Sequence, residues 1–117
     1  MLTWPISERM PRMASNLTTM TGLVLSITSA TVAPESADNL VAAFREVTSQ
    51  LPHSVLQTVL VKSGADDWRI ITLWRSREQM LGYRQKVGTS AAVRIFRDVN
   101  AEPTVTEFDV AHRAATD

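Results

Sequence analysis

The sequence predicts an α+β fold, with one four-stranded antiparallel sheet that carries helices on one face. Segments in which apolar residues alternate with polar ones indicate strands, and segments in which they recur every three or four positions indicate helices. These segments follow one another in the order β-α-β-β-α-(α)-β. The length of 117 residues, with 44% hydrophobic and 21% charged residues, fits one globular domain with a core of its own.

Residues 1–21 precede the first periodic segment. Pro5 and Pro11 interrupt any regular pattern there, and Ser, Thr and Met dominate. We expect a flexible N-terminal extension, which an over-long gene start would also produce. The alternative is an arm that packs on a partner subunit through Trp4 and Ile6.

The first strand is predicted from Leu23 to Val32, and both of its faces carry enough apolar residues to be half buried. Pro34 fits a first helical turn, and Ser36 or Asp38 can cap the free amides of a helix from Ala37 to Leu51. Four apolar residues at helical spacing form the inner stripe of this helix: Leu40, Phe44, Val47 and Leu51.

The second strand is predicted from Val55 to Lys62 and the third from Trp68 to Arg75, with a hairpin loop around Gly64 between them. The side chains of the third strand alternate between two faces. One face carries Trp68, Ile70, Thr72 and Trp74, and the other carries Arg69, Ile71, Leu73 and Arg75. Because Trp68 opens the strand after a loop, we interpret it as a rim or interface residue.

The third strand passes directly into a second helix. Ser76, followed three residues later by Gln79, is a capping box that begins this helix, and Gly88 ends it. A short helix from Thr89 to Val99 and a fourth strand from Thr104 to Val110 complete the domain. The residues predicted to face inward from the short helix are Ala92, Val93, Phe96 and Val99.

Four antiparallel strands in this order, with helices on one face, make a ferredoxin-like sandwich. The other face of the sheet would still carry Trp, Ile, Leu or Val side chains, and a single sheet cannot expose these without a risk of aggregation. We therefore expect a homodimer in which two sheets close face to face into a dimeric α/β barrel. The barrel domain is expected to span residues 22–111, with residues 112–117 as a C-terminal tail.

The junction between the third strand and the second helix, Leu73-Trp74-Arg75-Ser76-Arg77-Glu78-Gln79, resembles the Trp-x-Ser junction of the antibiotic biosynthesis monooxygenase (ABM) superfamily of dimeric α/β barrels. The stripe of the first helix and the paired helices of the second half agree with this resemblance, which covers residues 22–111. The resemblance implies a monooxygenase that uses no cofactor and acts on a small aromatic, phenolic or quinonoid substrate of polyketide type.

Three residues are candidates for the catalytic site implied by the resemblance. Trp74 matches the family's tryptophan and would shape the pocket, Arg94 would stabilise a substrate anion, and Tyr83 would position the substrate. Two positions depart from the family pattern: Ile70 stands in place of an asparagine and Met80 in place of an aromatic residue.

Each candidate also has an ordinary structural reading. Trp74 could fill the core, Tyr83 could be a half-buried amphipathic ring, and Arg94 could lie on a solvated face paired with Asp98. The two departures from the family pattern, at Ile70 and Met80, favour a rival function, a non-catalytic protein of the same fold that binds a small ligand or a partner. Haem degradation, a second chemistry implied by the resemblance, is disfavoured because residues 84–98 contain no histidine.

Composition excludes several other classes. The 12 basic and 12 acidic residues cancel, so no net field attracts nucleic acid or an anionic membrane. The absence of cysteine excludes disulfides and thiolate chemistry, and with only His53 and His112 a multi-histidine metal site is excluded. No run approaches the roughly 18 apolar residues of a membrane span. We expect a cytoplasmic protein.

Overall fold

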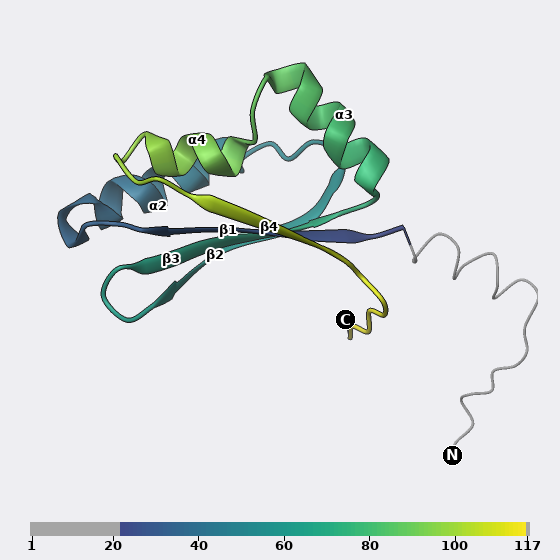
Figure 1. Ribbon diagram of the computed structural model, residues 1–117, viewed down its shortest axis with the longest axis horizontal. Coiled ribbons are helices and arrows are strands. Elements are labelled where there is room, and N and C mark those ends of the chain that lie inside the picture. Colours follow the sequence, from purple (N-terminus) through teal and green to yellow (C-terminus); the bar gives the residue numbers. More distant parts are fainter. Residues whose placement is uncertain (1–21, 117) are drawn as a thin grey trace, which may run out of the picture.

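A computed structural model describes residues 22–116 and confirms the predicted α+β class (Figure 1). The prediction of a flexible extension at residues 1–21 lies outside the described residues, as does Asp117. The elements in chain order are β1 (Val24–Thr31), a 3-10 turn η2 (Pro34–Ser36), α2 (Ala37–Val47), β2 (Val55–Ser63), β3 (Asp67–Trp74), α3 (Arg77–Val87), α4 (Ala91–Arg97) and β4 (Thr104–Asp109).

The four strands form one antiparallel sheet in the order β2-β3-β1-β4. The helices α2, α3 and α4 all lie on the same face of this sheet, which we call the helix face, as Figure 1 shows. The opposite face, which we call the open face, has no helix over it in the part of the chain that the structure describes. This is the ferredoxin-like arrangement that the element order predicts.

Alternation along the central strands divides the sheet as the sequence predicts. On the helix face every side chain of β1 and β3 from Val24 to Ala30 and from Trp68 to Trp74 is buried. These helix-face residues are Val24, Ser26, Thr28 and Ala30 on β1 and Trp68, Ile70, Thr72 and Trp74 on β3. Their neighbours on the open face are half-buried or exposed, because nothing within residues 22–116 covers them.

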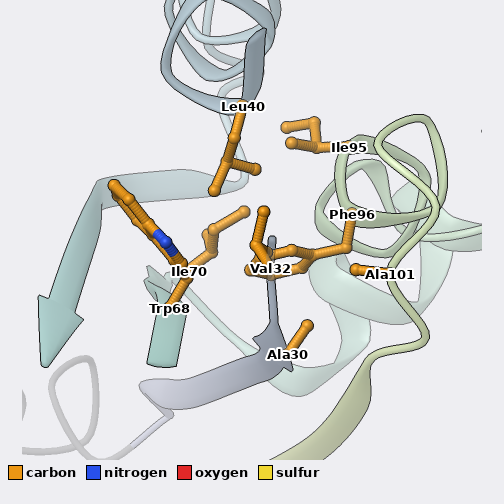
Figure 2. Close-up of a cluster of buried hydrophobic side chains, with 8 residues drawn as sticks. All are labelled: Ala30, Val32, Leu40, Trp68, Ile70, Ile95, Phe96 and Ala101. Atoms are coloured by element: carbon orange, nitrogen blue, oxygen red, sulfur yellow. The ribbon is translucent and has the colours of Figure 1, made fainter. Parts of the chain in front are cut away.

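The helix face carries two separate hydrophobic cores. The large core joins the hairpin end of the sheet to α2 and α4 (Figure 2). It comprises Ala30, Val32, Leu40, Trp68, Ile70, Ile95, Phe96 and Ala101. The small core lies under α3 and comprises Val24, Trp74 and Met80, with Val55 and Tyr83 packed against it.

The strand-to-helix junction forms as predicted. The Ser76 hydroxyl oxygen accepts a hydrogen bond from the Gln79 amide at 3.0 Å, which satisfies one of the free N–H groups of the first turn of α3. At the other end Gly88 has φ of 88°, a left-handed conformation that favours glycine, and its amide donates to the Arg84 carbonyl. Both ends of α3 are therefore fixed by local sequence.

The predicted first helix begins at Ala37 as expected, but its end and its cap were predicted wrongly. It was expected to continue to Leu51, but α2 ends at Val47 because the Thr48 and Ser49 hydroxyls bond back to the carbonyls of the last turn. Ser36 makes no side-chain capping bond, because it already has helical backbone angles at the end of η2. Val47 and Leu51 are consequently 41% and 45% exposed rather than core residues.

Two further expectations about packing are corrected. Trp68, interpreted as a rim or interface residue, is only 7% exposed and belongs to the large core. Ile95, absent from the predicted inner face of the short helix, is buried beside Phe96. Trp68 is buried because alternation puts it on the same face as Ile70, and the hairpin is long enough to carry it under α2 and α4.

The open face is strongly apolar. The strand register places apolar side chains from all four strands on it: Leu25, Ile27, Val59, Val61, Ile71, Leu73 and Phe108. Phe108 is 47% exposed.

Among residues 22–116 there is no helix of a length and hydrophobicity that would let it cross a membrane.

Candidate active-site cleft

A cleft of about 70 Å³ lies on the helix face, between the two cores. Ile70 and Ile95 of the large core form one side, and Trp74, Val55 and Tyr83 of the small core form the other. The remaining lining residues come from the end of α2, the loop after it, the start of α4 and the sheet: Phe44, Val47, Thr48, Gln50, Leu51, Pro52, Ser90, Ala91, Ala92, Ser26, Thr58 and Thr72. The early end of α2 thus leaves Val47 and Leu51 at the cleft instead of in the core.

The floor of the cleft is a polar row that crosses the sheet. Thr58, Thr72 and Ser26 stand directly opposite one another on β2, β3 and β1 and line the cleft. Glu107 on β4 continues the row beyond Ser26 but does not line the cleft. The Thr58 and Thr72 hydroxyls are 2.9 Å apart, and the Ser26 hydroxyl accepts a hydrogen bond from Trp74 Nε1 at 3.0 Å. Because the rows on both sides of it are largely apolar, this polar row is what divides the helix face into two cores.

Trp74 is held on several sides. Its ring lies 5.8 Å from the Tyr83 ring, centroid to centroid, at an angle of 46°. The Arg84 guanidinium lies 5.9 Å from the indole centroid. With 6% exposure, Trp74 is both a core residue and a wall of the cleft. The predicted role in shaping a pocket and the predicted role in core packing are therefore compatible.

Tyr83 is half-buried on α3 and lines the same cleft. Its position depends on α3, which the Ser76 cap begins and which the buried Met80 anchors on the small core. A tyrosine hydroxyl can donate or accept a hydrogen bond, and it is the only phenol in the protein. The structure thus brings two of the three predicted site residues, Trp74 and Tyr83, together.

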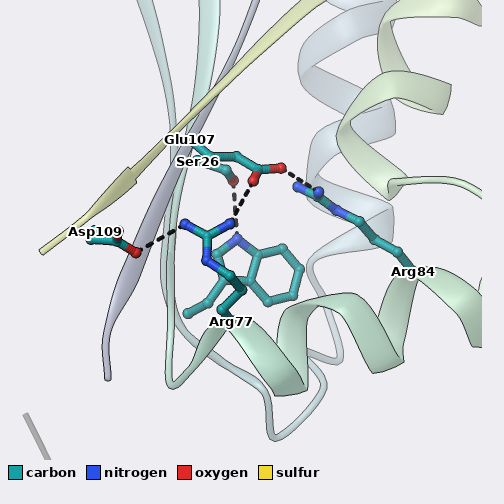
Figure 3. A network of polar contacts seen from close by, with 6 residues as sticks. Ser26, Arg77, Arg84, Glu107 and Asp109 are labelled. Atoms are coloured by element: carbon teal, nitrogen blue, oxygen red, sulfur yellow. Dashed lines mark hydrogen bonds and ion pairs between the residues drawn. The ribbon is translucent and has the colours of Figure 1, made fainter. Parts of the chain in front are cut away.

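An ion-pair network fastens α3 to the edge strand β4 (Figure 3). Arg77 donates to Glu107 and to Asp109, each at 2.9 Å, and Arg84 donates to Glu107 at 2.5 Å. The hydrogen bond from Arg84, and then that from Arg77, holds the pKa of Glu107 below its ordinary value of 4.5 against an opposing effect of burial. The network fixes the orientation of the helix that carries Tyr83.

Arg94 lies apart from these residues. It is exposed on α4 and lines a different hollow, between α2 and α4, together with Glu46 and Asp98. It does not line the cleft that contains Trp74 and Tyr83. Its role in stabilising a substrate anion, which the resemblance implies, stays a prediction.

Sequence reasoning missed the hydroxyl groups of the floor. Ser26 and Thr72 are buried residues on the helix face, and Thr58 is half-buried opposite Thr72. The available signal was a polar residue at a position of an alternating strand that shares a face with apolar residues, and each of the three strands carries at least one. Without the register, nothing in the sequence shows that these three positions form one row.

The lining has no charged side chain in the part of the chain that the structure describes, and its polar groups are hydroxyls and the Gln50 amide. Nor do residues 22–116 contain a group of three or more His, Cys, Asp or Glu side chains placed to hold a metal ion. Chemically, the arrangement is an apolar, aromatic-walled cleft with a floor of hydrogen-bonding groups, the usual composition of a small-molecule site.

No protein-family model matches the sequence, and no curated protein matches it at a significant level. Solved structures do match. The chain is similar to a conserved protein from Methanosarcina mazei (TM-score 0.64, 7% identity, 79% of this chain and 96% of that one). It is also similar to a Caulobacter crescentus protein grouped with the antibiotic biosynthesis monooxygenases (TM-score 0.63, 13% identity, 85% and 99%).

A further match is SnoaB, a cofactor-independent oxygenase from Streptomyces nogalater, with a TM-score of 0.57 and 13% identity over 82% of this chain and 99% of that one. At these identities the likeness shows the fold alone. The resemblance found in the sequence is thereby confirmed as a resemblance of fold: the chain has the ferredoxin-like fold of antibiotic biosynthesis monooxygenases, and SnoaB matches the same fold.

Proposed function

We propose that this protein is a cofactor-independent monooxygenase that acts on a small aromatic substrate of phenolic or quinonoid type. The observation that supports this most directly is the cleft itself, in which Trp74 and Tyr83 form an aromatic wall above hydroxyl groups. The fold shared with a cofactor-independent oxygenase supports the same proposal.

In the proposed reaction the substrate is the reductant. Oxidation of an activated ring methylene by one O2 gives a ring carbonyl and one water, so the four electrons come from the substrate and no flavin or metal is required. The protein contributes a water-poor site that positions the substrate and stabilises the charge that develops on its oxygen. Trp74 would form the wall of this site, and Tyr83 would position the substrate through its hydroxyl.

Oxygen uptake tests the proposal. The full-length protein would be supplied with a panel of anthrones, hydroquinones and flavonoids, without added metal or flavin. We expect uptake with at least one compound, and a loss of at least about tenfold in Tyr83→Phe if its hydroxyl acts in the reaction. Trp74→Phe would test the wall, and Arg94→Ala would test the predicted anion-binding role. No uptake with any compound would contradict the proposal.

One observation favours the rival function of non-catalytic ligand binding. Within residues 22–116 the side chains that line the cleft include no carboxylate, imidazole or amine that could act as a general base at neutral pH. A binding protein needs no such group, whereas an oxygenase must take the substrate proton by other means. Ligand binding without oxygen uptake for the whole panel would support the rival.

We also propose that the protein is a homodimer whose two open faces pack on each other as an α/β barrel. The support is the apolar surface of the open face, which spans all four strands and which a soluble monomer would rarely expose. Light scattering of the full chain should give twice the monomer mass, and Ile71→Glu, at the middle of this face, should give a monomer. Leu81→Glu, at an exposed position of α3 away from the open face, is the matched control. A compact wild-type monomer would contradict the proposal.

A further inference from the structure

Recognition in the cleft depends on hydroxyl groups, because none of its lining side chains within residues 22–116 carries a charge. A carboxylate or other anion placed there would lose its hydration with no cation to replace it. The Arg84 guanidinium, which lies over the Trp74 ring, is already bonded to Glu107 and does not line the cleft. The site therefore disfavours an anionic ligand.

The hydrogen-bonding capacity of Ser26 identifies one donor that points to a ligand. A serine hydroxyl has one proton to donate and two lone pairs that accept. An indole N–H can only donate, so the bond of 3.0 Å between Trp74 Nε1 and Ser26 Oγ uses a lone pair of Ser26 and leaves the serine proton free. Among residues 22–116 this hydroxyl has no second partner, although it is buried and lines the cleft.

The bond from Trp74 also fixes and strengthens this donor. It orients the hydroxyl oxygen, and an accepted hydrogen bond polarises the O–H group so that it donates more strongly. Thr72, opposite Ser26 on β3, is already paired with Thr58. This pair uses one of its two protons in the bond between the two hydroxyls and retains the other, which either residue can carry. The neighbouring floor therefore offers a second donor, whose position is not fixed as that of Ser26 is.

We propose that the cleft binds a neutral aromatic ligand and that Ser26, oriented by Trp74, donates a hydrogen bond to a carbonyl or phenolic oxygen of that ligand. Trp74 is then a positioning residue as well as a wall, because its N–H is committed to Ser26 and not to the ligand. This inference rests on the proposed function in that the same cleft holds the substrate, and it deepens that function by naming the class of ligand.

Equilibrium dialysis of the full-length protein against three probes tests the inference. The three probes share one ring system. 1-Naphthol carries a neutral hydroxyl, naphthalene carries no oxygen, and 1-naphthoate carries a charged carboxylate. We expect 1-naphthol to bind about three- to tenfold more tightly than naphthalene, the worth of one hydrogen bond. We expect 1-naphthoate to bind at least about tenfold more weakly than 1-naphthol.

Ser26→Ala should lower the affinity for 1-naphthol by about three- to tenfold and leave that for naphthalene unchanged. Ser26→Thr, which retains the hydroxyl, should keep the preference for 1-naphthol. Ser29→Ala, on the same strand but on the open face, is the matched control and should change nothing. If Ser26→Ala does not fold, Trp74→Phe serves instead. This change keeps the serine but removes the indole N–H that donates to it. The affinity for 1-naphthol should then fall more than the affinity for naphthalene.

Three results would overturn the inference: equal affinity of the wild-type protein for 1-naphthol and naphthalene, 1-naphthoate binding as tight as 1-naphthol, or a uniform loss of all probes in Ser26→Ala. These results are distinct from failure of the proposed function. Selective binding of 1-naphthol without oxygen uptake by any phenol removes the oxygenase proposal and leaves this inference. Equal rates of uptake with neutral and carboxylated substrates remove this inference and leave the oxygenase.

Discussion

The two ends of the helix face are built from the same sheet but are filled differently. At the hairpin end, aliphatic and aromatic side chains of the strands meet α2 and α4, and the large core closes completely. Towards α3, the polar row interrupts the apolar surface of the sheet, and α2 ends before it can cover this region. A cleft therefore remains beside the small core. A few hydroxyls and one early helix end therefore produce a cleft within an otherwise regular fold.

The largest expected loss of stability comes from a substitution in the large core. Phe96 is fully buried there, and Phe96→Ala should lower the free energy of unfolding by about 3–5 kcal/mol, through lost burial and the cavity left behind. Leu51→Ala at the cleft, where the side chain is 45% exposed, should cost about 1 kcal/mol or less. Urea denaturation of both variants measures the contrast. Similar losses would mean that the cleft wall is packed as tightly as the core.

An intermediate effect is expected where the cleft meets the small core. Ser26→Ala leaves the buried Trp74 N–H without its acceptor, which should cost about 1–3 kcal/mol of stability. In the Trp74→Phe background the same change should cost clearly less, because no N–H remains to be satisfied. A double-mutant cycle of denaturation midpoints gives this coupling energy. A coupling near zero would argue against the hydrogen bond.

A smaller effect, with a pH signature, is expected at the ion pairs that hold α3. The pKa of Glu107 is lowered in the folded protein, so its contribution to stability is fully present above the ordinary value of 4.5 and is lost as pH falls through the folded pKa. Glu107→Gln should therefore lower stability by about 1 kcal/mol at pH 7. Denaturation at pH 7 and below pH 4 measures the difference, which should shrink in acid. A difference that does not change with pH would contradict the assignment.

The smallest effect is expected when both partners of the hydroxyl pair are replaced. Thr58→Val with Thr72→Val exchanges two hydrogen-bonded groups for apolar groups of the same shape, which should change stability by no more than about 0.5 kcal/mol. Thr72→Val alone should cost more, because Thr58 then loses its partner. Thermal denaturation of the single and double variants decides this. A large loss in the double variant would show that the polar row stabilises the fold.

The sequence predicts the framework of the molecule because that framework follows local rules. Alternation identifies the buried faces of β1 and β3, and the spacing of Ser76 and Gln79 identifies the start of α3. The early end of α2 was missed because Val47 and Leu51 continue the helical stripe in sequence. The Phe44 carbonyl accepts from both the amide and the hydroxyl of Thr48, and the periodicity of the sequence does not show this contact at the helix end.

The candidate site was predictable only in part for the same reason. Trp74 and Tyr83 lie close in sequence, on a strand and on the helix that follows it, so their meeting follows from one junction. Ser26 belongs to a strand 48 residues away from Trp74, and only the β1–β3 register makes it a partner. Arg94 was placed by analogy with a family pattern, and the packing of α4 on α2 leaves it at a separate hollow that Glu46 and Asp98 also line.

The floor of hydroxyls has a consequence for how such a protein diverges. Each of its three side chains stands on a different strand, so each can be exchanged for an apolar residue separately from the other two. The preference for a ligand can therefore drift by single substitutions, one polar contact at a time, while the large core keeps the domain folded. Ligand preference can thus change in the hydroxyl row with a smaller loss of stability than a change in the large core would cause.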